Sequence, residues 1–508
     1  MIYPMLSQGI MPLIAYLNLL LIMIFAILSS NIIYKKLTKI KKRYLIALII
    51  VFLAGLYIRL HYSPLHHGFF IDESFYMESA KNILAHQRSF LSTGDYEKQI
   101  GWPVLLTIPF FIFGVNNYVA IYTSVFIGSL SVFLIFVLVF LIFRNEKSAL
   151  FSSVLLAVLP LHIFYSGTAE TAAASIFFIL LTYISFFFML EKFDIKFAYL
   201  TLFLLLFAIQ VRLENFLMFI PMTIYILIKK VDLRWKKSVV PAMISIPFFA
   251  SVIFQYFQIK GFYVKAYATE LAFFGFENIS DKFYLFIKSI DLFYLFFIFI
   301  AVIGAYYSFK KEKLLSYFFA SWFLVFSLYY LLYLFADDFH FLPALVALIP
   351  IAAFGIDSLI AYFSEYFKIK QNNLLLFSII FILALFFISY DGVSMPYFEL
   401  ETRVMGKLSE DIPPDCIIVA ELPNIITSTT ELEAIGTAKF LNDASDDLFS
   451  YKNRCLLYFE DMYCKENFLP NSMLRCGRMR SKFKLTDFIW HKNGELGFYF
   501  YKISAKRP

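Results

Sequence analysis

The chain has 508 residues, of which 61% are hydrophobic and only 16% are charged, and its mean hydropathy is +0.74. A soluble domain of ordinary composition is about half apolar and about a quarter charged, so this composition excludes a soluble globular protein. The formal net charge is +7, and Lys and Arg cluster in short segments, as in the loops between membrane spans. The sequence therefore predicts a mainly α, polytopic membrane protein.

Long apolar runs recur along most of the chain. A membrane-spanning helix needs about 20 mostly apolar residues. By this criterion we expect about 12 transmembrane helices, with approximate bounds 12–34, 44–60, 118–143, 148–165, 171–190, 196–211, 213–229, 238–257, 288–308, 314–335, 341–363 and 373–390. The first run is too long for the core of a signal peptide and lacks a small-residue cleavage site after it, so we expect a span there.

Clusters of basic residues indicate which loops face the cytoplasm. Three clusters lie at Lys35–Arg43, Lys229–Lys237 and Lys310–Lys313, and all fall on one side if the predicted spans alternate. By the positive-inside rule this side is cytoplasmic. The loop 61–117 and the residues after about Tyr390 are then external. We therefore expect a multi-pass protein of the cell membrane whose working surface is the outer one.

The tail after Tyr390 has a different composition, because charge rises and long apolar runs stop. Its segments are typical of two short strands, a helix and a β-hairpin turning at Asn493-Gly494, at Cys416–Glu421, Leu456–Asp461, Glu431–Leu441 and Phe488–Ile503 respectively. We expect a small external α/β domain over 391–508. It would follow an extra N-terminal helix with its basic loop over 1–43 and a transmembrane catalytic domain over 44–390.

All four cysteines lie in this tail, at Cys416, Cys455, Cys464 and Cys476. An even number on the oxidising side predicts one or two disulfides. Cys455 with Cys464 is a short-loop candidate, but four cysteines allow three complete pairings. A zinc site with four thiolate ligands is the competing interpretation, which the lack of a CxxC spacing disfavours.

An acidic pair in apolar surroundings follows the second predicted span. Asp72 and Glu73 lie between Phe69-Phe70-Ile71 and a predicted amphipathic helix whose apolar residues include Tyr76 and Leu84. Carboxylates so near hydrocarbon are costly unless they face water, a partner or a substrate. The pair is therefore a candidate for chemistry, although Asp72 could equally be only the N-cap of that helix.

Further polar side chains stand at the predicted outer ends of spans. These candidates are Glu170, Arg212, Glu214, Asp338 with its neighbour Asp337, and His340. We expect them to lie at one depth and to converge on the acidic pair. Each also has a plainer interpretation: Arg212 could anchor the chain at the membrane interface, Asp338 could mark the end of a span, and Glu170 could be a solvated turn residue.

Metal binding has little support in the sequence. His66 and His67 are adjacent, but no HxxxH or HExxH spacing accompanies them. We therefore predict no metal ligands and no certain cofactor, and a divalent metal stays an open alternative.

The order of these features resembles the GT-C membrane glycosyltransferases, especially the group of protein O-mannosyltransferases and lipid A aminoarabinose transferases. The resemblance covers about residues 44–390. It rests on Asp72-Glu73-Ser-Phe-Tyr76, Ala80-Lys-Asn-Ile-Leu84, Gly101-Trp102-Pro103 and Phe111-Ile-Phe-Gly114 before a long span. The chain departs from the group where paired prolines are usual, at Trp102-Pro103, and where an Arg-Tyr pair is common, at His340-Phe341. The extra N-terminal span and the cysteine-containing tail are further departures.

The resemblance implies an enzyme that moves a sugar from a polyprenyl (dolichyl) monophosphate to an acceptor on the external face, with inversion, as a mannosyltransferase of protein glycosylation does. The chemistry of this reaction suits two of the residues: Asp72 could be the general base for the incoming hydroxyl, and Arg212 is the best external candidate to hold the donor phosphate, because guanidinium binds phosphate in a bidentate manner. Glu73 and Glu170 would position the acceptor or the sugar. The further substrate-binding candidates are Glu214, Asp338 and His340. The sugar, and whether the acceptor is a protein, a glycan or a lipid, stay open.

Two other classes of membrane protein are the alternatives. A transporter or flippase of lipid-linked sugars would carry ionisable residues in the middle of spans, whereas here they gather at the outer ends. A non-catalytic glycan-assembly protein whose tail recruits a partner is the second alternative. An oligosaccharyltransferase is disfavoured because the tail has no WWDYG-like motif, and no nucleic-acid partner is expected.

Overall fold

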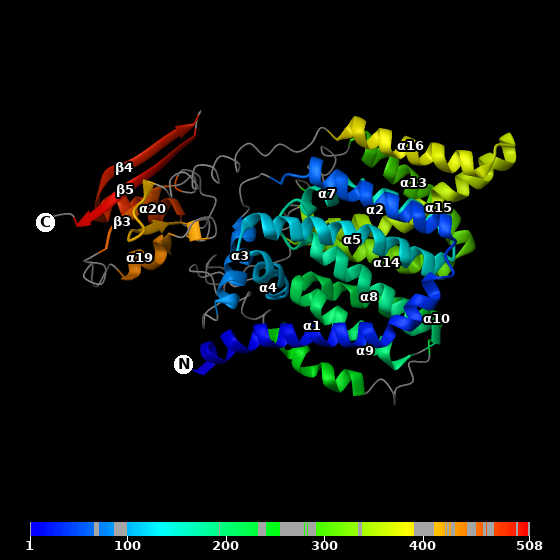
Figure 1. The fold of residues 1–508 in the computed structure, drawn as a ribbon, viewed down its shortest axis with the longest axis horizontal. Coiled ribbons are helices and arrows are strands. Elements are labelled where there is room, and N and C mark those ends of the chain that lie inside the picture. Colours follow the sequence, from blue (N-terminus) through cyan, green and yellow to red (C-terminus); the bar gives the residue numbers. More distant parts are fainter. Residues whose placement is uncertain are drawn as a thin grey trace.

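The chain folds into a helical body and a small sheet domain (Figure 1). The structure is a computed structural model that describes residues 2–65, 71–85, 99–192, 194–231, 240–254, 279, 282, 291–333, 338–390, 411–421, 423, 426–427, 432–443, 454–460, 464, 472–493 and 496–505.

The helical body consists of long apolar helices packed side by side. Its labelled elements are α1 (Ile2–Leu37), α2 (Lys42–Tyr62), α3 (Ile71–Leu84), α4 (Gly101–Phe113), α5 (Asn117–Phe143), α6 (Glu146–Ala157), α7 (Pro160–Ser166), α8 (Ala172–Lys192), α9 (Ile195–Val211), the 3₁₀ helix η1 (Leu213–Met218), α10 (Phe219–Lys229), α13 (Leu292–Lys311), α14 (Lys313–Leu332), the 3₁₀ helix η2 (Asp338–His340), α15 (Leu342–Phe367) and α16 (Gln371–Ser389). Large apolar side chains such as Ile27, Phe299 and Ile388 lie exposed on the outside of the bundle. Such a surface suits a helix bundle surrounded by lipid.

The predicted membrane architecture is confirmed, but the number of spans is not. Among the described residues, eight helices are long and apolar enough to cross a bilayer, or nine if the bent pair α6 and α7 counts as one span. Three further apolar helices are shorter, over Gly101–Phe113, Ile195–Val211 and Val240–Phe254. Each of the twelve predicted segments contains helix, although the one over 213–229 begins as the 3₁₀ helix η1.

The fourth predicted span is in fact two helices, α6 and α7, bent by 59°. Pro160 has no backbone N–H, so the Leu156 carbonyl loses its helical donor. Arg59 of α2 is fully buried and supplies the missing donors, from Nη2 to the Leu156 oxygen at 3.2 Å and from Nη1 to the Ala157 oxygen at 3.3 Å. Pro160 thus causes the bend, and Arg59 donates hydrogen bonds to the carbonyls that the bend leaves without helical partners.

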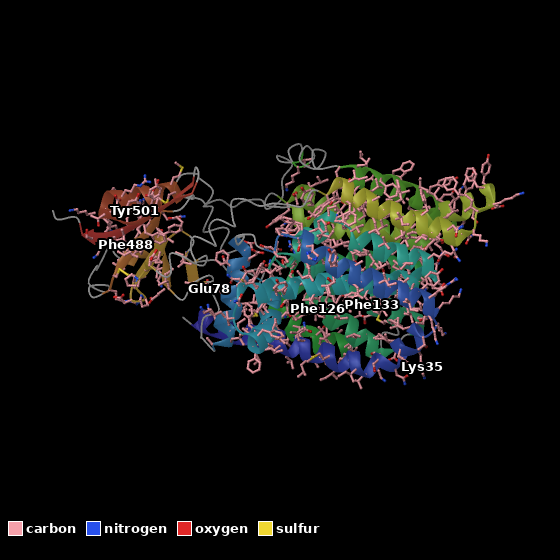
Figure 2. The ribbon with its side chains drawn as sticks, turned by 45° about the horizontal axis from the view of Figure 1, so that its top comes forward. Lys35, Glu78, Phe126, Phe133, Phe488 and Tyr501 are labelled. Atoms are coloured by element: carbon pink, nitrogen blue, oxygen red, sulfur yellow. A yellow bond between two sulfur atoms is a disulfide. The ribbon has the colours of Figure 1, made fainter. Side chains whose placement is uncertain are left out.

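The two ends of the helical body differ in charge. The basic connection between α1 and α2 lies at one end, and α3 with α4 lies at the other (Figure 1). Figure 2 shows the same separation, with Lys35 and Glu78 labelled near opposite ends of the body. At the basic end, Lys36 and Arg144 both pair with Glu191, at 2.5 Å and 2.8 Å. The acidic pair of α3 therefore lies far from the basic loops.

The sheet domain has five strands in the order β2-β1-β3-β5-β4. Its elements are β1 (Ile417–Ala420), β2 (Glu433–Gly436), α19 (Thr437–Asp443), β3 (Leu456–Glu460), α20 (Ser472–Lys482), β4 (Phe483–Asn493) and β5 (Leu496–Ala505). β1 is parallel to β2 and β3, whereas β5 is antiparallel to β3 and β4. The predicted strands and the antiparallel pairing of the hairpin are confirmed, whereas Gly494 of the predicted turn lies outside the described residues. The predicted helix over 431–441 is wrong in its first half, because residues 433–436 pair with β1 as β2.

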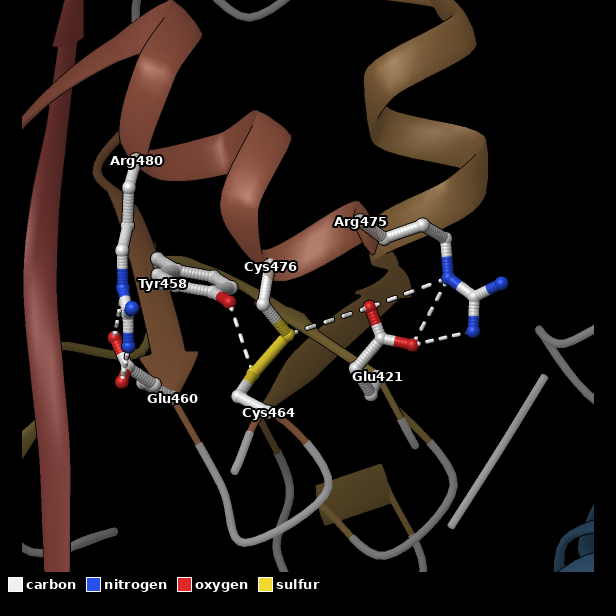
Figure 3. Close-up of a disulfide and its surroundings, with 7 residues drawn as sticks. All are labelled: Glu421, Tyr458, Glu460, Cys464, Arg475, Cys476 and Arg480. Atoms are coloured by element: carbon white, nitrogen blue, oxygen red, sulfur yellow. Dashed lines mark hydrogen bonds and ion pairs between the residues drawn. A yellow bond between two sulfur atoms is a disulfide. The ribbon is translucent and has the colours of Figure 1, made fainter. Parts of the chain in front are cut away.

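Two disulfides close the domain, Cys416–Cys455 and Cys464–Cys476. The zinc interpretation and the Cys455–Cys464 pairing are therefore both wrong. The first disulfide joins the residues that precede β1 and β3, and the second joins the chain after β3 to α20. Figure 3 shows that ion pairs lie beside the second disulfide: Arg475 pairs with Glu421 at 2.6 Å, and Arg480 pairs with Glu460. These contacts tie α20 to the carboxyl ends of β1 and β3.

Candidate active site

The two carboxylates of the acidic pair have different environments. Both stand in the first turn of α3. Asp72 is half-buried, whereas Glu73 is fully buried, and its Oε1 accepts a hydrogen bond from the backbone N–H of Ala169 at 2.5 Å. Glu73 therefore binds the protein's own backbone, and Asp72 is the more accessible carboxylate.

The turn that connects α7 to α8, residues 167–171, is the centre of the site. Its Ala169 peptide is held from two sides, because Trp102 Nε1 donates to the Ala169 carbonyl at 2.7 Å while Glu73 accepts from its N–H. Gly167 approaches Ser63 so closely that an added Cβ would lie 2.4 Å from the Ser63 Cβ. Only glycine fits there, so the turn is packed tightly against the end of α2.

Glu170 lies in this turn and is 3% exposed. It is therefore buried, and the interpretation as a solvated turn residue is wrong. Its backbone N–H lies 3.4 Å from Thr168 Oγ1, within hydrogen-bonding distance. The next residue, Thr171, accepts a hydrogen bond at Oγ1 from Arg212 Nη1 at 3.3 Å. The turn thus links the acidic pair of α3 to the arginine that follows α9.

Arg212 is buried and held from three directions. Its Nε and Nη2 contact Glu214 Oε1, its Nη1 contacts Thr171, and its guanidinium carbon lies 4.3 Å from the centre of the Phe339 ring. A guanidinium stacks favourably on an aromatic face. With 6% exposure, Arg212 is not an anchor that snorkels to the membrane surface.

The segment η2 brings further polar groups to the same region. His340 Nε2 lies 3.8 Å from Glu214 Oε1, and the His340 ring stacks on Phe339 with 4.3 Å between ring centres. Asp338 Oδ1 accepts a hydrogen bond from the Tyr330 hydroxyl at 3.4 Å. Burial raises the pKa of Asp338, and the Tyr330 hydrogen bond partly opposes this shift.

Five of the seven candidates therefore meet at the turn: Glu170 belongs to it, Glu73 and Arg212 contact its residues, and Glu214 and His340 follow through the contacts Arg212–Glu214 and Glu214–His340. Asp72 is next to Glu73 in α3, and Asp338 is two residues before His340. Asp337 and the adjacent histidines of the loop after α2 lie outside the described residues.

The sequence did not predict the roles of three residues of the site. Trp102 stands in the segment Gly101-Trp102-Pro103 that contributes to the resemblance, but nothing in the sequence shows that it donates to Ala169, and no motif marks the contact of Thr171 with Arg212. Lys282 is buried, donates to the Tyr330 carbonyl at 3.0 Å and contacts the Tyr333 carbonyl, which places a second cation beside η2. Its position in the predicted external loop between two spans was the available signal.

No cluster of three or more His, Cys, Asp or Glu side chains suited to a metal ion occurs within the residues that the structure describes.

Comparison with known proteins assigns the fold. Residues 99–255 match a family model described as dolichyl-phosphate-mannose-protein mannosyltransferase. The crystal structure of ArnT from Cupriavidus metallidurans bound to undecaprenyl phosphate superposes with a TM-score of 0.61 at 10% identity, covering 91% of this chain and 98% of that chain. The chain has a GT-C fold. The apo state of ArnT gives a TM-score of 0.60 at 10% identity, covering 90% of this chain and 97% of that chain.

No curated protein sequence matches the chain. The family model covers the part of the GT-C fold that contains Trp102, Glu170, Arg212 and Glu214, whereas Asp72 and the rest of α3 precede the matched segment. At 10% identity the likeness to ArnT concerns the fold, so the roles of individual residues rest on the geometry of this chain.

Proposed function

We propose that the protein is a membrane glycosyltransferase that moves a sugar from a polyprenyl monophosphate to an acceptor on the external face of the cell membrane. The configuration at the anomeric carbon would be inverted. The observation that carries the proposal is the set of contacts that joins the acidic pair to Arg212 through the turn 167–171. These contacts support the proposal because they connect α3, which carries the candidate base, to the candidate phosphate ligand through one short turn. The ArnT crystal structure, which holds undecaprenyl phosphate, supports a donor of this class.

Asp72 is the general base in this proposal. Attack of an acceptor hydroxyl on the anomeric carbon forms one carbon–oxygen bond and breaks the bond to the phosphate oxygen, and the hydroxyl proton must go to a base. An Asp carboxylate can accept this proton as a general base. Glu73 is committed to the Ala169 N–H, whereas Asp72 is only half-buried, which favours Asp72.

Arg212 is the proposed ligand of the donor phosphate. The leaving group is a lipid phosphate whose negative charge needs a fixed cation, and guanidinium binds phosphate in a bidentate manner. Guanidinium has five N–H donors. The contacts with Glu214 and Thr171 use three of the Arg212 N–H groups in the described structure, which leaves two for a phosphate.

The remaining candidates would bind the rest of the substrates. Glu170 is proposed to position the sugar or the acceptor hydroxyl, because it stands in the chain between Ala169, which contacts Glu73, and Thr171, which contacts Arg212. Asp338, His340 and Glu214 are proposed to line the opposite side of Arg212. A mannosyl donor on dolichyl phosphate is the first to test, because the matched family model describes mannosyltransferases.

The site and the sheet domain are proposed to face the outside of the cell. Basic loops lie at the end of the bundle away from α3, which supports this orientation by the positive-inside rule. The two disulfides of the tail support it as well, because disulfides persist in oxidising compartments.

Asp72→Asn should lower the transfer rate at saturating lipid donor by at least about 100-fold, because a general base contributes about 10²–10⁴-fold. Glu73→Gln should cost less, because its amide oxygen can still accept the Ala169 N–H. The measurement is the transfer rate of both purified variants, with donor binding as the control for folding. If Asp72→Asn stays active while Glu73→Gln is inactive, the two roles are reversed; if both stay active, the base is another carboxylate.

Arg212→Lys should weaken donor binding roughly ten- to a hundredfold although the charge is kept, because a charge-assisted hydrogen bond is worth about 1.5–3 kcal/mol and the bidentate geometry is lost. The matched control is Arg144→Lys, an exposed arginine at the basic end, which should leave donor affinity unchanged. Equilibrium binding of the polyprenyl-phosphate sugar measures both. Wild-type donor affinity in both Arg212→Lys and Arg212→Ala would mean that another residue, Lys282 or His340, binds the phosphate.

The proposed orientation predicts how single cysteines react with a membrane-impermeant thiol reagent in intact cells. A cysteine introduced at Ala85 or Asn116, which are both exposed, should be labelled, and one introduced near Lys39 or Lys311 should be labelled only after the membrane is permeabilised. The reverse pattern would overturn the orientation and would move the site to the cytoplasmic side.

A further inference from the structure

Two consecutive peptide planes meet at Ala169, and each is fixed by a buried side chain. A peptide bond is planar, so one hydrogen bond restricts the orientation of the whole plane. Glu73 accepts from the Ala169 N–H and fixes the plane before it, at 2.5 Å, and Trp102 Nε1 donates to the Ala169 carbonyl and fixes the plane after it, at 2.7 Å. Together the two contacts set the backbone dihedral angles of Ala169.

The plane that Trp102 holds contains the N–H of Glu170. Glu170 is buried, and Thr171 follows it and accepts a hydrogen bond from Arg212 at 3.3 Å. A rotation of this plane would therefore displace both side chains relative to Arg212. Displacements of about 1 Å at a catalytic geometry cost about a hundredfold in rate, so this restraint matters for any reaction at the site.

The start of α4, which carries Trp102, also packs against the backbone next to Arg212. Gly101, the neighbour of Trp102, begins α4 and lies against the last peptide of α9, so that an added Cβ would be 2.6 Å from both the Gln210 carbonyl carbon and the Val211 nitrogen. Arg212 is the next residue. The start of α4 therefore contacts the backbone beside Arg212 and, through Trp102, the turn that carries Glu170.

We propose that Trp102 is a positioning residue for sugar transfer: its indole N–H holds the Ala169 peptide and thereby fixes Glu170 and Thr171 relative to Arg212. This inference rests on the proposed function, since it assigns a role in that reaction. Trp102 touches neither the donor nor the acceptor in this account, and it acts only through the turn.

The test is Trp102→Phe, which keeps a buried aromatic ring and removes the donor to Ala169. The chain offers a matched control in Trp322→Phe. Trp322 is also fully buried, but its Nε1 makes no hydrogen bond within the part of the chain that the structure describes. Both variants lose the same ring volume, but Trp102→Phe also leaves the buried Ala169 carbonyl without this donor, so it should lower the melting temperature of the purified protein at least as much as Trp322→Phe does.

Trp102→Phe should lower kcat about tenfold, because Glu170 and Thr171 are then held less accurately relative to Arg212, and should change the KM for the lipid donor less than threefold. Trp322→Phe should change kcat less than twofold. Trp102→Phe combined with Thr171→Val should lose less than the product of the two single effects, because both act on one turn. Equal kcat in the two tryptophan variants, or multiplicative effects in the double variant, would overturn the proposal.

Hydrogen exchange separates this inference from the proposed function, because it needs no substrate. The amides of Ala169 and Glu170 should exchange faster in Trp102→Phe than in the wild type, and should be unchanged in Trp322→Phe. If the wild type transfers no sugar, the proposed function fails, and with it the role of Trp102 in transfer. Faster exchange in Trp102→Phe would then still show that Trp102 holds the turn 167–171. Unchanged exchange in Trp102→Phe would overturn the role of Trp102 in either case.

Discussion

The site depends on a bend in a membrane helix. Pro160 breaks the hydrogen-bond ladder between α6 and α7, and Arg59 donates to the carbonyls that the break leaves without helical partners. A buried arginine within a membrane protein is costly unless its donors are satisfied. Here Arg59 also donates to the Gly55 carbonyl and to Ser166 Oγ, and it contacts His162 Nδ1. The bend is thus a stable feature, and it ends in the turn 167–171.

That turn explains how groups from four parts of the chain meet. Its residues contact the end of α2, the start of α3, the start of α4 and the arginine after α9. The backbone of the turn provides the Ala169 N–H and carbonyl, and the side chain of Thr171 provides the contact with Arg212. The polar groups of the site are therefore positioned mainly by the backbone of the turn. A protein can keep its backbone geometry while most of its sequence changes, and the chain shares its fold with ArnT at only 10% sequence identity.

Apolar patterning predicted the helices well, because each span needs a long apolar run that nothing else in the chain resembles. It did not predict where a run is broken, although Pro160 was a visible signal. The strand β2 was read as helix because a four-residue segment carries little periodicity, and its pairing with β1 decides its structure. The disulfide pairing could not be predicted, since it depends on which strands become neighbours.

For the candidate site, too, the sequence predicts some features and not others. Arg212 and Glu214 were found because charges at the ends of spans are conspicuous in an apolar sequence. Their mutual contact was not predicted, and neither was the difference in burial between Asp72 and Glu73. The contact between Arg212 and Glu214 is local, and it depends on the conformation of the chain where α9 ends. The difference in burial depends on how α3 packs against the turn, a tertiary contact between residues almost a hundred positions apart.

The most direct test of the account is an experimental structure of the protein with a polyprenyl monophosphate bound. We expect the phosphate oxygens to lie within hydrogen-bonding distance, about 3 Å, of the Arg212 guanidinium, with Asp72 facing the side where the sugar would be attached. A phosphate bound at the basic end of the bundle, or beside Lys282 without contact to Arg212, would contradict the assignment of this site.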